Sequence, residues 1–345
     1  MKLTNTIMVG MMAVALCTSC SNEEAEFSNF DYQTVYFGNQ YPLRTLELGE
    51  DPEVDLTLDN QRKIEIKAAV GGYRENPGNI VIDYKVDESL CEGLYFDDYN
   101  TKVTPLPASY YKLSSNQLTI PAGKIMGGVQ VEFTDAFFED SKCLGVNYVI
   151  PIRMTQVVQG ADSILSGKPL VENPDRNISS HWSVQPKDFV LYAIKYVNPW
   201  HGHYLRRGVD NITAADGKQS VQVRHEQYVE KNEVVDLVTT GLKSLKLPLT
   251  IKAADGHNID YNVVLTFADD NTCTITGDSD EFGIVGNGRF VSKGDKNSIG
   301  GKDCDALYLD YDVVFKNLNT AYTTKDTLTL RNRGVKPEYL KVTKK

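Results

Sequence analysis

The chain has 345 residues, with 36 lysines and arginines against 46 aspartates and glutamates, and a formal net charge of −10 at pH 7. This acidic balance argues against a nucleic-acid partner, which needs a basic surface, and against electrostatic binding to an anionic membrane. The length exceeds what one hydrophobic core usually serves, so we expect two domains.

Residues 1–19 have the organisation of a lipoprotein signal peptide. Lys2 makes the start basic, and residues 7–16 form an apolar run that is too short to span a bilayer. Small residues lead to Cys20, which we expect to become the lipid-anchored N-terminus after cleavage. Cys17 is a weaker alternative anchor, and cleavage without lipidation is the simpler alternative.

Residues 20–29 form an acidic, solvated tether, which begins with Ser21-Asn22-Glu23-Glu24 directly after the anchor. An acidic segment in this place resembles the surface-export signal of Bacteroidetes lipoproteins. The resemblance implies an outer-membrane protein that faces the cell exterior, with lipid as its only tie to the membrane. A plain linker is the alternative.

Short segments with period-two alternation fill residues 30–198 and predict a β-sandwich. Turns that contain glycine or proline separate them. The apolar run at residues 189–197 is typical of a buried strand, and Pro199 after it marks the domain boundary. The clearest alternating segments are residues 62–68, 81–86 and 129–133.

Residues 199–345 alternate in the same way over longer segments. Eight or nine such strands predict a closed up-and-down barrel of the lipocalin type, and a second sandwich is the alternative. No internal repeat is visible. The best segments are residues 220–229, 244–251, 259–267 and 306–315.

Four cysteines follow the anchor, two in each expected domain. Cys91 and Cys143 could form one disulfide in an oxidising exterior, and Cys273 and Cys304 another. Buried free thiols are the alternative, because domains of this size do not need a covalent link.

A series of motifs resembles the N-terminal immunoglobulin-like domain of unknown function of Bacteroidetes surface lipoproteins, which also precedes some family 18 endoglycosidases. The resemblance covers residues 30–197 and implies a sandwich encoded among polysaccharide-utilisation genes. More loosely, Trp200-His201-Gly202-His203-Tyr204 resembles the start of a companion C-terminal family, which implies a calycin-like barrel without a catalytic residue. The N-terminal motifs are residues 106–113, 118–124, 129–131 and 148–153.

Two near-matches to catalytic motifs fail on their residues. The aspartates between residues 305 and 312 echo the family 18 glycosidase series, but Val314 stands where the acid glutamate is needed. His225-Glu226 begins a zinc-protease pattern whose second histidine is replaced by Val229, on a strand rather than a helix. We therefore predict no catalytic residue and no enzyme.

Metal and cofactor motifs are equally incomplete. His201 and His203 could share a strand face and a metal, but no further ligand is close in sequence. Residues 277–281 offer oxygens without the spacing of a calcium loop. The glycines between residues 283 and 288 precede no helix, so we expect a bulge or barrel corner instead of a phosphate loop. We predict neither a metal nor a cofactor.

Ligand contacts are predicted at two places. Trp182 lies in a polar stretch and is expected to be an exposed platform on which a sugar ring stacks. Polar-tipped residues at the barrel mouth offer donors to sugar hydroxyls or to a uronic acid carboxylate, although they could simply solvate the rim. Trp200 is expected to plug the bottom of the barrel. The mouth residues are His201, His203, Tyr204, Arg206 and Arg207.

These features predict an all-β, non-enzymatic, cell-surface lipoprotein that binds an oligosaccharide or polysaccharide and works with outer-membrane uptake proteins. A structural scaffold among outer-membrane proteins is the alternative, and a glycoside hydrolase is the less favoured one. The functional step rests on resemblance, since a fold alone does not specify a function.

Overall fold

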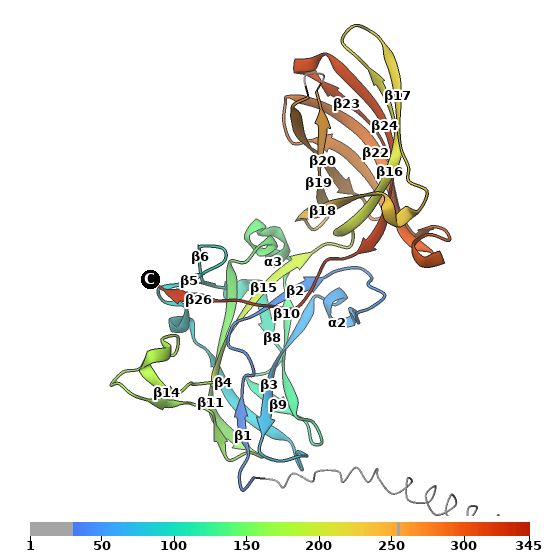
Figure 1. The fold of residues 1–345 in the computed structure, drawn as a ribbon. Helices are drawn as coiled ribbons and strands as arrows, with labels where there is room; N and C mark the ends of the chain where they lie inside the picture. The colour runs from blue at the N-terminus through green and yellow to red at the C-terminus, as the bar shows by residue number, and fades with distance from the viewer. Residues whose placement is uncertain (1–29, 254–255) are drawn as a thin grey trace, which may run out of the picture.

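The computed structural model describes residues 30–253 and 256–345 and consists of two β units, with the barrel stacked on one end of the first unit (Figure 1). The predicted signal peptide, Cys20 and the tether lie outside these residues. Within the described ranges, no helix has the length and apolar character needed to cross a membrane.

The first unit is a sandwich-like sheet that curls around one core. Its strand order is β12-β1-β3-β10-β9-β4-β11-β15-β2-β25, with β7 and β8 attached to β11 and β10. The strands are β1 (Thr34–Tyr36), β2 (Pro42–Glu47), β3 (Lys63–Gly71), β4 (Ile80–Val86), β5 (Leu94–Phe96), β6 (Thr101–Lys102), β7 (Thr104–Pro105), β8 (Tyr111–Leu113), β9 (Gln117–Ile120), β10 (Met126–Phe133), β11 (Tyr148–Gln159), β12 (Ser163–Ile164), β13 (Lys168–Pro169), β14 (Trp182–Val184), β15 (Phe189–Val197) and β25 (Glu338–Tyr339). The helical turns are α2 (Thr57–Asn60), η1 (Glu88–Cys91), η2 (Ala108–Tyr110), α3 (Asp135–Glu139), η3 (Ser141–Leu144) and η4 (Ser179–His181).

Alternation in β3 explains why the sheet has one buried face. Ile64, Ile66 and Ala68 point into a core that also receives side chains from β1, β2, β4, β9, β10, β11 and β15. β15 departs from alternation because both of its faces are covered. One face meets this core, while Phe189 and Leu191 pack on a second cluster beneath η1 and β5.

The second unit is a closed eight-stranded antiparallel barrel, as the longer alternating segments predicted. The order β16-β18-β19-β20-β21-β22-β23-β24 closes where β24 pairs with β16, and β17 extends β16 as a ribbon. This closure rules out the alternative of a second sandwich. The strands are β16 (Gly202–Thr213), β17 (Gln219–Arg224), β18 (Glu233–Gly241), β19 (Ser244–Lys252), β20 (Asn258–Phe267), β21 (Thr272–Gly277), β22 (Phe282–Asp295), β23 (Cys304–Phe315) and β24 (Thr320–Asn332), with turns η5 (Val229–Lys231), η6 (Ile299–Gly301) and η7 (Lys316–Leu318).

Side chains fill the barrel. Trp200 is buried and stacks on Phe267 with ring centroids 3.9 Å apart, at the end of the barrel that faces the first unit. Leucines, valines and aromatic residues continue this core above it. Gly286 on β22 is required by close packing, because a Cβ there would lie 2.4 Å from the Cβ of Tyr311. The expected barrel corner is thus a close approach of two strands.

The expected barrel domain, residues 199–345, is too long at its C-terminal end. After β24 the chain returns to the first unit, where β25 pairs with Pro42 and Leu43 of β2. β26 (Val342–Lys344) then pairs with β5, and Leu340 is buried in the cluster beneath η1. Short pairings and one buried leucine therefore place residues 335–345 in the sandwich, not in the barrel.

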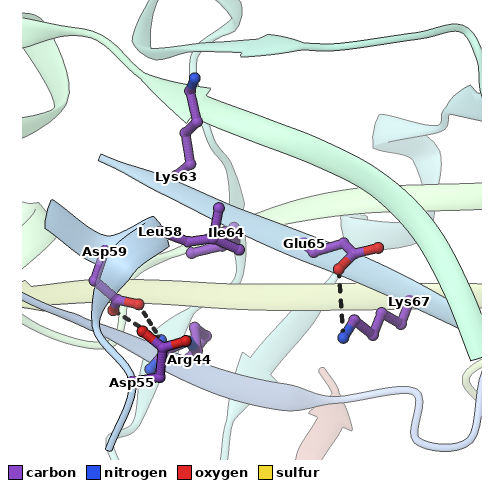
Figure 2. A pocket seen from close by; sticks show the side chains of 8 residues that line it. All are labelled: Arg44, Asp55, Leu58, Asp59, Lys63, Ile64, Glu65 and Lys67. Carbon is purple, nitrogen blue, oxygen red and sulfur yellow. Dashed lines mark hydrogen bonds and ion pairs between the residues drawn. The ribbon is translucent and has the colours of Figure 1, made fainter. Parts of the chain in front are cut away.

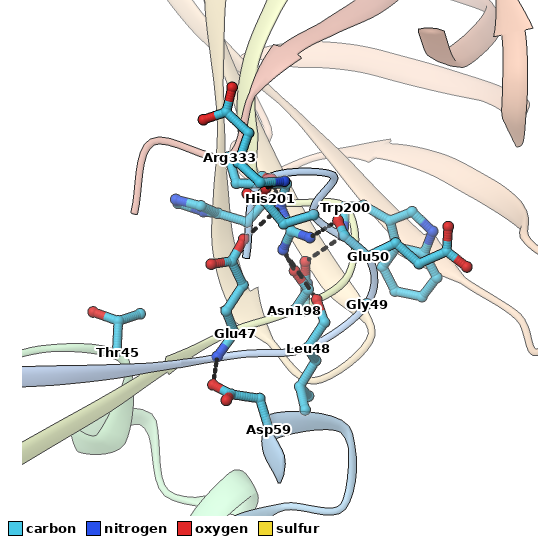
Figure 3. Close-up of polar contacts among 12 residues, drawn as sticks. Thr45, Glu47, Leu48, Gly49, Glu50, Asp59, Asn198, Trp200, His201 and Arg333 are labelled. Atoms are coloured by element: carbon cyan, nitrogen blue, oxygen red, sulfur yellow. Dashed lines mark hydrogen bonds and ion pairs between the residues drawn. The ribbon is translucent and has the colours of Figure 1, made fainter. Parts of the chain in front are cut away.

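Arg333 joins the two units at their junction (Figure 3). Its side chain is 2% exposed, and its Nη2 donates to the carbonyls of Leu48 (3.1 Å) and Asn198 (2.8 Å). Its Nη1 donates to the carbonyl of Glu50 (3.1 Å) and its Nε to that of His201 (2.8 Å). One guanidinium thus holds a loop of the first unit, the linker and the last barrel strand together.

Glu47 is the counter-ion of this junction. Its Oε1 lies 3.4 Å from the Arg333 Nε, and its side chain is buried. Burial raises the pKa of the Glu47 carboxyl, and the nearby Arg333 opposes that rise. The Glu47 carboxylate therefore balances the charge of the buried Arg333 guanidinium, whose hydrogen bonds are accepted by the four carbonyl groups.

All four cysteines in the described ranges are free thiols. Cys91, Cys143 and Cys273 are buried and Cys304 is half-buried. Burial raises the pKa of each of the three buried thiols to about 12, so they behave as small apolar side chains. Of the two alternatives left open by the sequence, the structure has the free thiols.

Candidate functional site

Trp182 is not the exposed platform that its polar surroundings suggested. The side chain is 7% exposed, and its Nε1 donates to the Asp175 carbonyl at 2.7 Å. The Arg176 guanidinium lies 5.9 Å from the indole centroid. The polar residues around Trp182 fold over its indole ring, so the ring presents no face to a sugar.

The two histidines lie at the end of the barrel that faces the first unit, and they have different surroundings. His201 accepts a hydrogen bond at Nδ1 from the Thr239 amide (3.2 Å), and burial, with the nearby Arg333 charge, lowers its pKa to about 4. His203 is more exposed and pairs with Asp236, 2.5 Å from its Nδ1. Across residues 30–253 and 256–345, no cluster of three or more potential ligands could hold a metal.

Strand alternation separates the other predicted contacts. Tyr204 is fully buried in the barrel and donates its hydroxyl to the Trp200 carbonyl at 2.9 Å. Arg206 also points inward, whereas Arg207 points outward and pairs with Asp295 at 2.6 Å. The predicted residues therefore do not converge on one mouth site.

The inward-facing Arg206 belongs to a buried ionic network. Asp326 accepts from the Arg206 Nε (2.9 Å), from the Arg224 Nη2 (2.6 Å) and from the Tyr311 hydroxyl (2.9 Å). Arg224 also pairs with Asp210. These groups pair with one another inside the barrel, although the Arg224 Nε is buried without a hydrogen-bond partner, so the Arg206 donors are engaged within the fold.

A concave polar site lies instead on the first unit, where α2 crosses β2 and β3 (Figure 2). The pocket has a volume of about 220 Å³. Six of its side chains carry charge, and two are apolar. The lining residues are Arg44, Asp55, Leu58, Asp59, Lys63, Ile64, Glu65 and Lys67.

A bidentate ion pair fixes one wall of this pocket. The Arg44 Nη2 donates to both carboxylate oxygens of Asp59, at 2.7 and 2.6 Å, and Asp59 also accepts from the Glu47 amide at 2.8 Å. Asp59 is only 2% exposed, so its oxygens are committed to these partners. The ion pair and the backbone hydrogen bond therefore hold Asp59 in place as a wall of the pocket.

The facing residues are more available. Asp55 accepts from the amide (3.0 Å) and the hydroxyl (2.6 Å) of Thr57, and these hydrogen bonds lower the pKa of its carboxyl. Lys67 lies 3.3 Å from Glu65. The pocket thus presents an ionised carboxylate and a flexible ammonium–carboxylate pair beside the apolar Leu58.

The charges of the pocket cancel. Arg44, Lys63 and Lys67 oppose Asp55, Asp59 and Glu65. Such a site offers donors and acceptors side by side without a net field, which suits an uncharged ligand rich in hydroxyl groups. The alternation of lysine and glutamate at residues 63, 65 and 67 was visible in the sequence. An ordinary solvated strand face has the same pattern, so the sequence did not predict the pocket.

The architecture defines a two-domain all-β protein in which a sandwich carries a closed barrel on one end. A family model described as a domain of unknown function, DUF5627, matches residues 199–334, and a model for an N-terminal domain matches residues 30–160. The barrel match ends where the chain returns to the sandwich. No catalytic family is among these matches.

A crystal structure of a protein of unknown function from Bacteroides ovatus is 55% identical, with a TM-score of 0.87. The alignment covers 92% of this chain and 100% of that chain. The chain therefore belongs to the same family as this Bacteroides ovatus protein, with a DUF5627 domain as its C-terminal barrel, which confirms the suspected relationship to Bacteroidetes proteins of this two-domain type.

Two further crystal structures are much less similar. One, of unknown function from Bacteroides ovatus, is 13% identical with a TM-score of 0.41 and covers 90% of this chain and 99% of that chain. The other is described as an auxiliary nutrient binding protein from Bacteroides thetaiotaomicron. It is 14% identical, with a TM-score of 0.40, and the alignment covers 84% of this chain and 90% of that chain. Scores this low say nothing about the function of this chain. No curated protein matches it.

Proposed function

We propose that this protein is a non-enzymatic glycan-binding lipoprotein, anchored through Cys20 on the outside of the outer membrane, and that the pocket between α2 and β3 holds a neutral sugar unit. The observation that carries the proposal is the balance of three cationic and three anionic side chains around an apolar floor. The resemblance to proteins encoded among polysaccharide-utilisation genes supports the same function, with uptake proteins as partners.

The chemistry of a sugar ring matches these walls. Each hydroxyl group can donate to a carboxylate such as Asp55 and accept from an ammonium such as Lys67, while the C–H groups of the ring contact Leu58. The volume of about 220 Å³ is below the range of roughly 300–1,000 Å³ typical of drug-sized ligands, which suits one ring. Exchange of water for protein hydrogen bonds gains little, so we expect a dissociation constant of roughly millimolar for one sugar.

The position of the first unit is compatible with surface display. β1, at the start of the described chain, lies at the end of the sandwich away from the barrel (Figure 1). A lipid on Cys20 would therefore leave the barrel pointing away from the membrane.

Calorimetric titration of the mature protein with cellohexaose, mannohexaose, maltohexaose, xylohexaose and galactohexaose tests the proposal. The double variant Asp55→Asn, Lys67→Met should lower affinity for the bound glycan at least about tenfold, a loss of roughly 1.4 kcal/mol. Asp216 and Lys218 form a matched exposed ion pair on the barrel at 2.7 Å, so Asp216→Asn, Lys218→Met is the control and should bind as the wild type does.

Two results would overturn this function. One is that none of the five hexasaccharides binds, and the other is that the pocket variant binds as tightly as the control. Incubation with the same glycans, labelled at one end, checks the non-enzymatic part of the proposal. Appearance of shorter labelled products would show that the protein is a hydrolase.

A further inference from the structure

A second polar pocket adjoins the first on the same unit. It has a volume of about 210 Å³ and is formed by β3, β8 and β10 together with the residue after β8. Apart from Leu113, which packs against the core, its five lining side chains are polar or charged. The lining residues are Lys63, Lys112, Leu113, Ser114, Gln130 and Glu132.

Strand register explains why the two pockets are neighbours. Glu132 on β10 lies opposite Lys63 on β3 and opposite Lys112 on β8, so the three side chains form one row across three strands. Gln130, two residues earlier, lies opposite Glu65, which lines the first pocket. The surface therefore continues from one pocket to the other without an intervening element.

Lys63 is the shared wall, because it lines both pockets. Its ammonium points away from Arg44 and Asp55 in Figure 2. Its Nζ lies 3.6 Å from a Glu132 oxygen, a long and partly exposed contact. A flexible lysine held so loosely can shift without cost to the core, which makes it a movable partition between the pockets.

We propose that the two pockets form one extended site, which binds at least two linked units of a neutral glycan chain across Lys63. This inference rests on the proposed function and adds the length of the ligand. Across both pockets the charges again cancel, since Lys112 and Glu132 add one charge of each sign to the six of the first pocket. An uncharged chain is therefore favoured along the whole site.

The second pocket has the side chains that a further sugar unit requires. The Ser114 hydroxyl accepts from the Gln130 amide at 3.1 Å, and the Ser114 amide donates to the Gln130 carbonyl at 2.9 Å, so this corner is ordered. The exposed Gln130 carboxamide presents one donor group and one acceptor group to a ligand. Leu113 packs against the core opposite Val131, so the contacts that this pocket offers are polar.

Titration with a length series tests the extended site. Glucose, mannose, galactose and xylose, with the matching di-, tri- and hexasaccharides of the five series used above, are measured against the mature protein. Affinity should rise about tenfold or more between one unit and three, because the second unit binds at a high effective concentration, and then level off.

Variants locate the gain. Lys112→Ala with Gln130→Ala should remove the rise with chain length and leave monosaccharide affinity within twofold of the wild type. Lys124→Ala, in the exposed turn before β10, is the control and should keep the rise. A length-independent affinity, or a rise that survives in the double variant, overturns the extended site while the single-pocket function stands. No binding to any of the sugars overturns both.

Discussion

Replacement of Arg333 by alanine should uncouple the barrel from the sandwich. The change removes four hydrogen bonds to carbonyl groups and leaves the buried Glu47 carboxylate without its counter-ion. Loss of one partner from a buried ion pair costs about 3–5 kcal/mol, and the freed carbonyls add to this unless water enters the junction. We therefore expect a loss of about 3–5 kcal/mol in the free energy of unfolding.

Urea unfolding followed by tryptophan fluorescence measures this effect. The chain has two tryptophans: Trp182 reports on the sandwich and Trp200 on the base of the barrel. The wild type should unfold in one transition, and the Arg333→Ala variant should unfold earlier, in two. Arg331→Ala, on an exposed residue near the end of β24, is the control. A stability within about 1 kcal/mol of the wild type, with a single transition, would refute the role given to Arg333.

Three further results are expected. Deletion of residues 335–345 removes the β25 and β26 pairings and exposes the site of Leu340, so the single urea transition should shift to lower urea by a loss of about 2 kcal/mol or more; an unchanged midpoint would contradict the assignment of the tail. The pKa of His201 falls to about 4 in the folded protein, so its neutral form contributes fully to the free energy of unfolding above pH 6.5. That contribution should be lost as the pH drops towards 4, and the loss should be smaller in His201→Gln. Equal pH profiles of the two proteins would contradict this role of His201. Cys20→Ala should move the protein from the membrane fraction to the soluble one, and unchanged fractionation would show that the anchor is elsewhere.

The barrel was predictable because its strands are long and alternate with period two, which fixes both the element type and the buried face. The same rule applied to neighbouring residues would have separated Arg206 from Arg207, since adjacent positions on a strand face opposite sides of the wall. Treating the mouth residues as one group ignored this geometry. The ionic network around Asp326 was out of reach, because it joins β16, β17, β23 and β24 across more than one hundred residues in sequence.

Other features leave weak signals in a sequence. β25 and β26 are two and three residues long and lie on either side of a single buried leucine, so no alternation marks them. Trp182 was misplaced because its polar neighbours fold back over the indole, and composition does not record that contact. The pocket depends on α2, a single turn that brings Asp55 and Asp59 to β2 and β3, and such a turn has no periodic pattern.

The return of the chain to the sandwich has a consequence for biogenesis. Because β25 and β26 follow the barrel in sequence, the sandwich cannot complete its sheet until the residues after the barrel have been synthesised. The barrel, residues 199–334, is complete in sequence before that point. Folding thus runs from the middle outwards, and a chain cut before residue 335 would leave the edge of β2 unpaired, which marks it for chaperones and proteases.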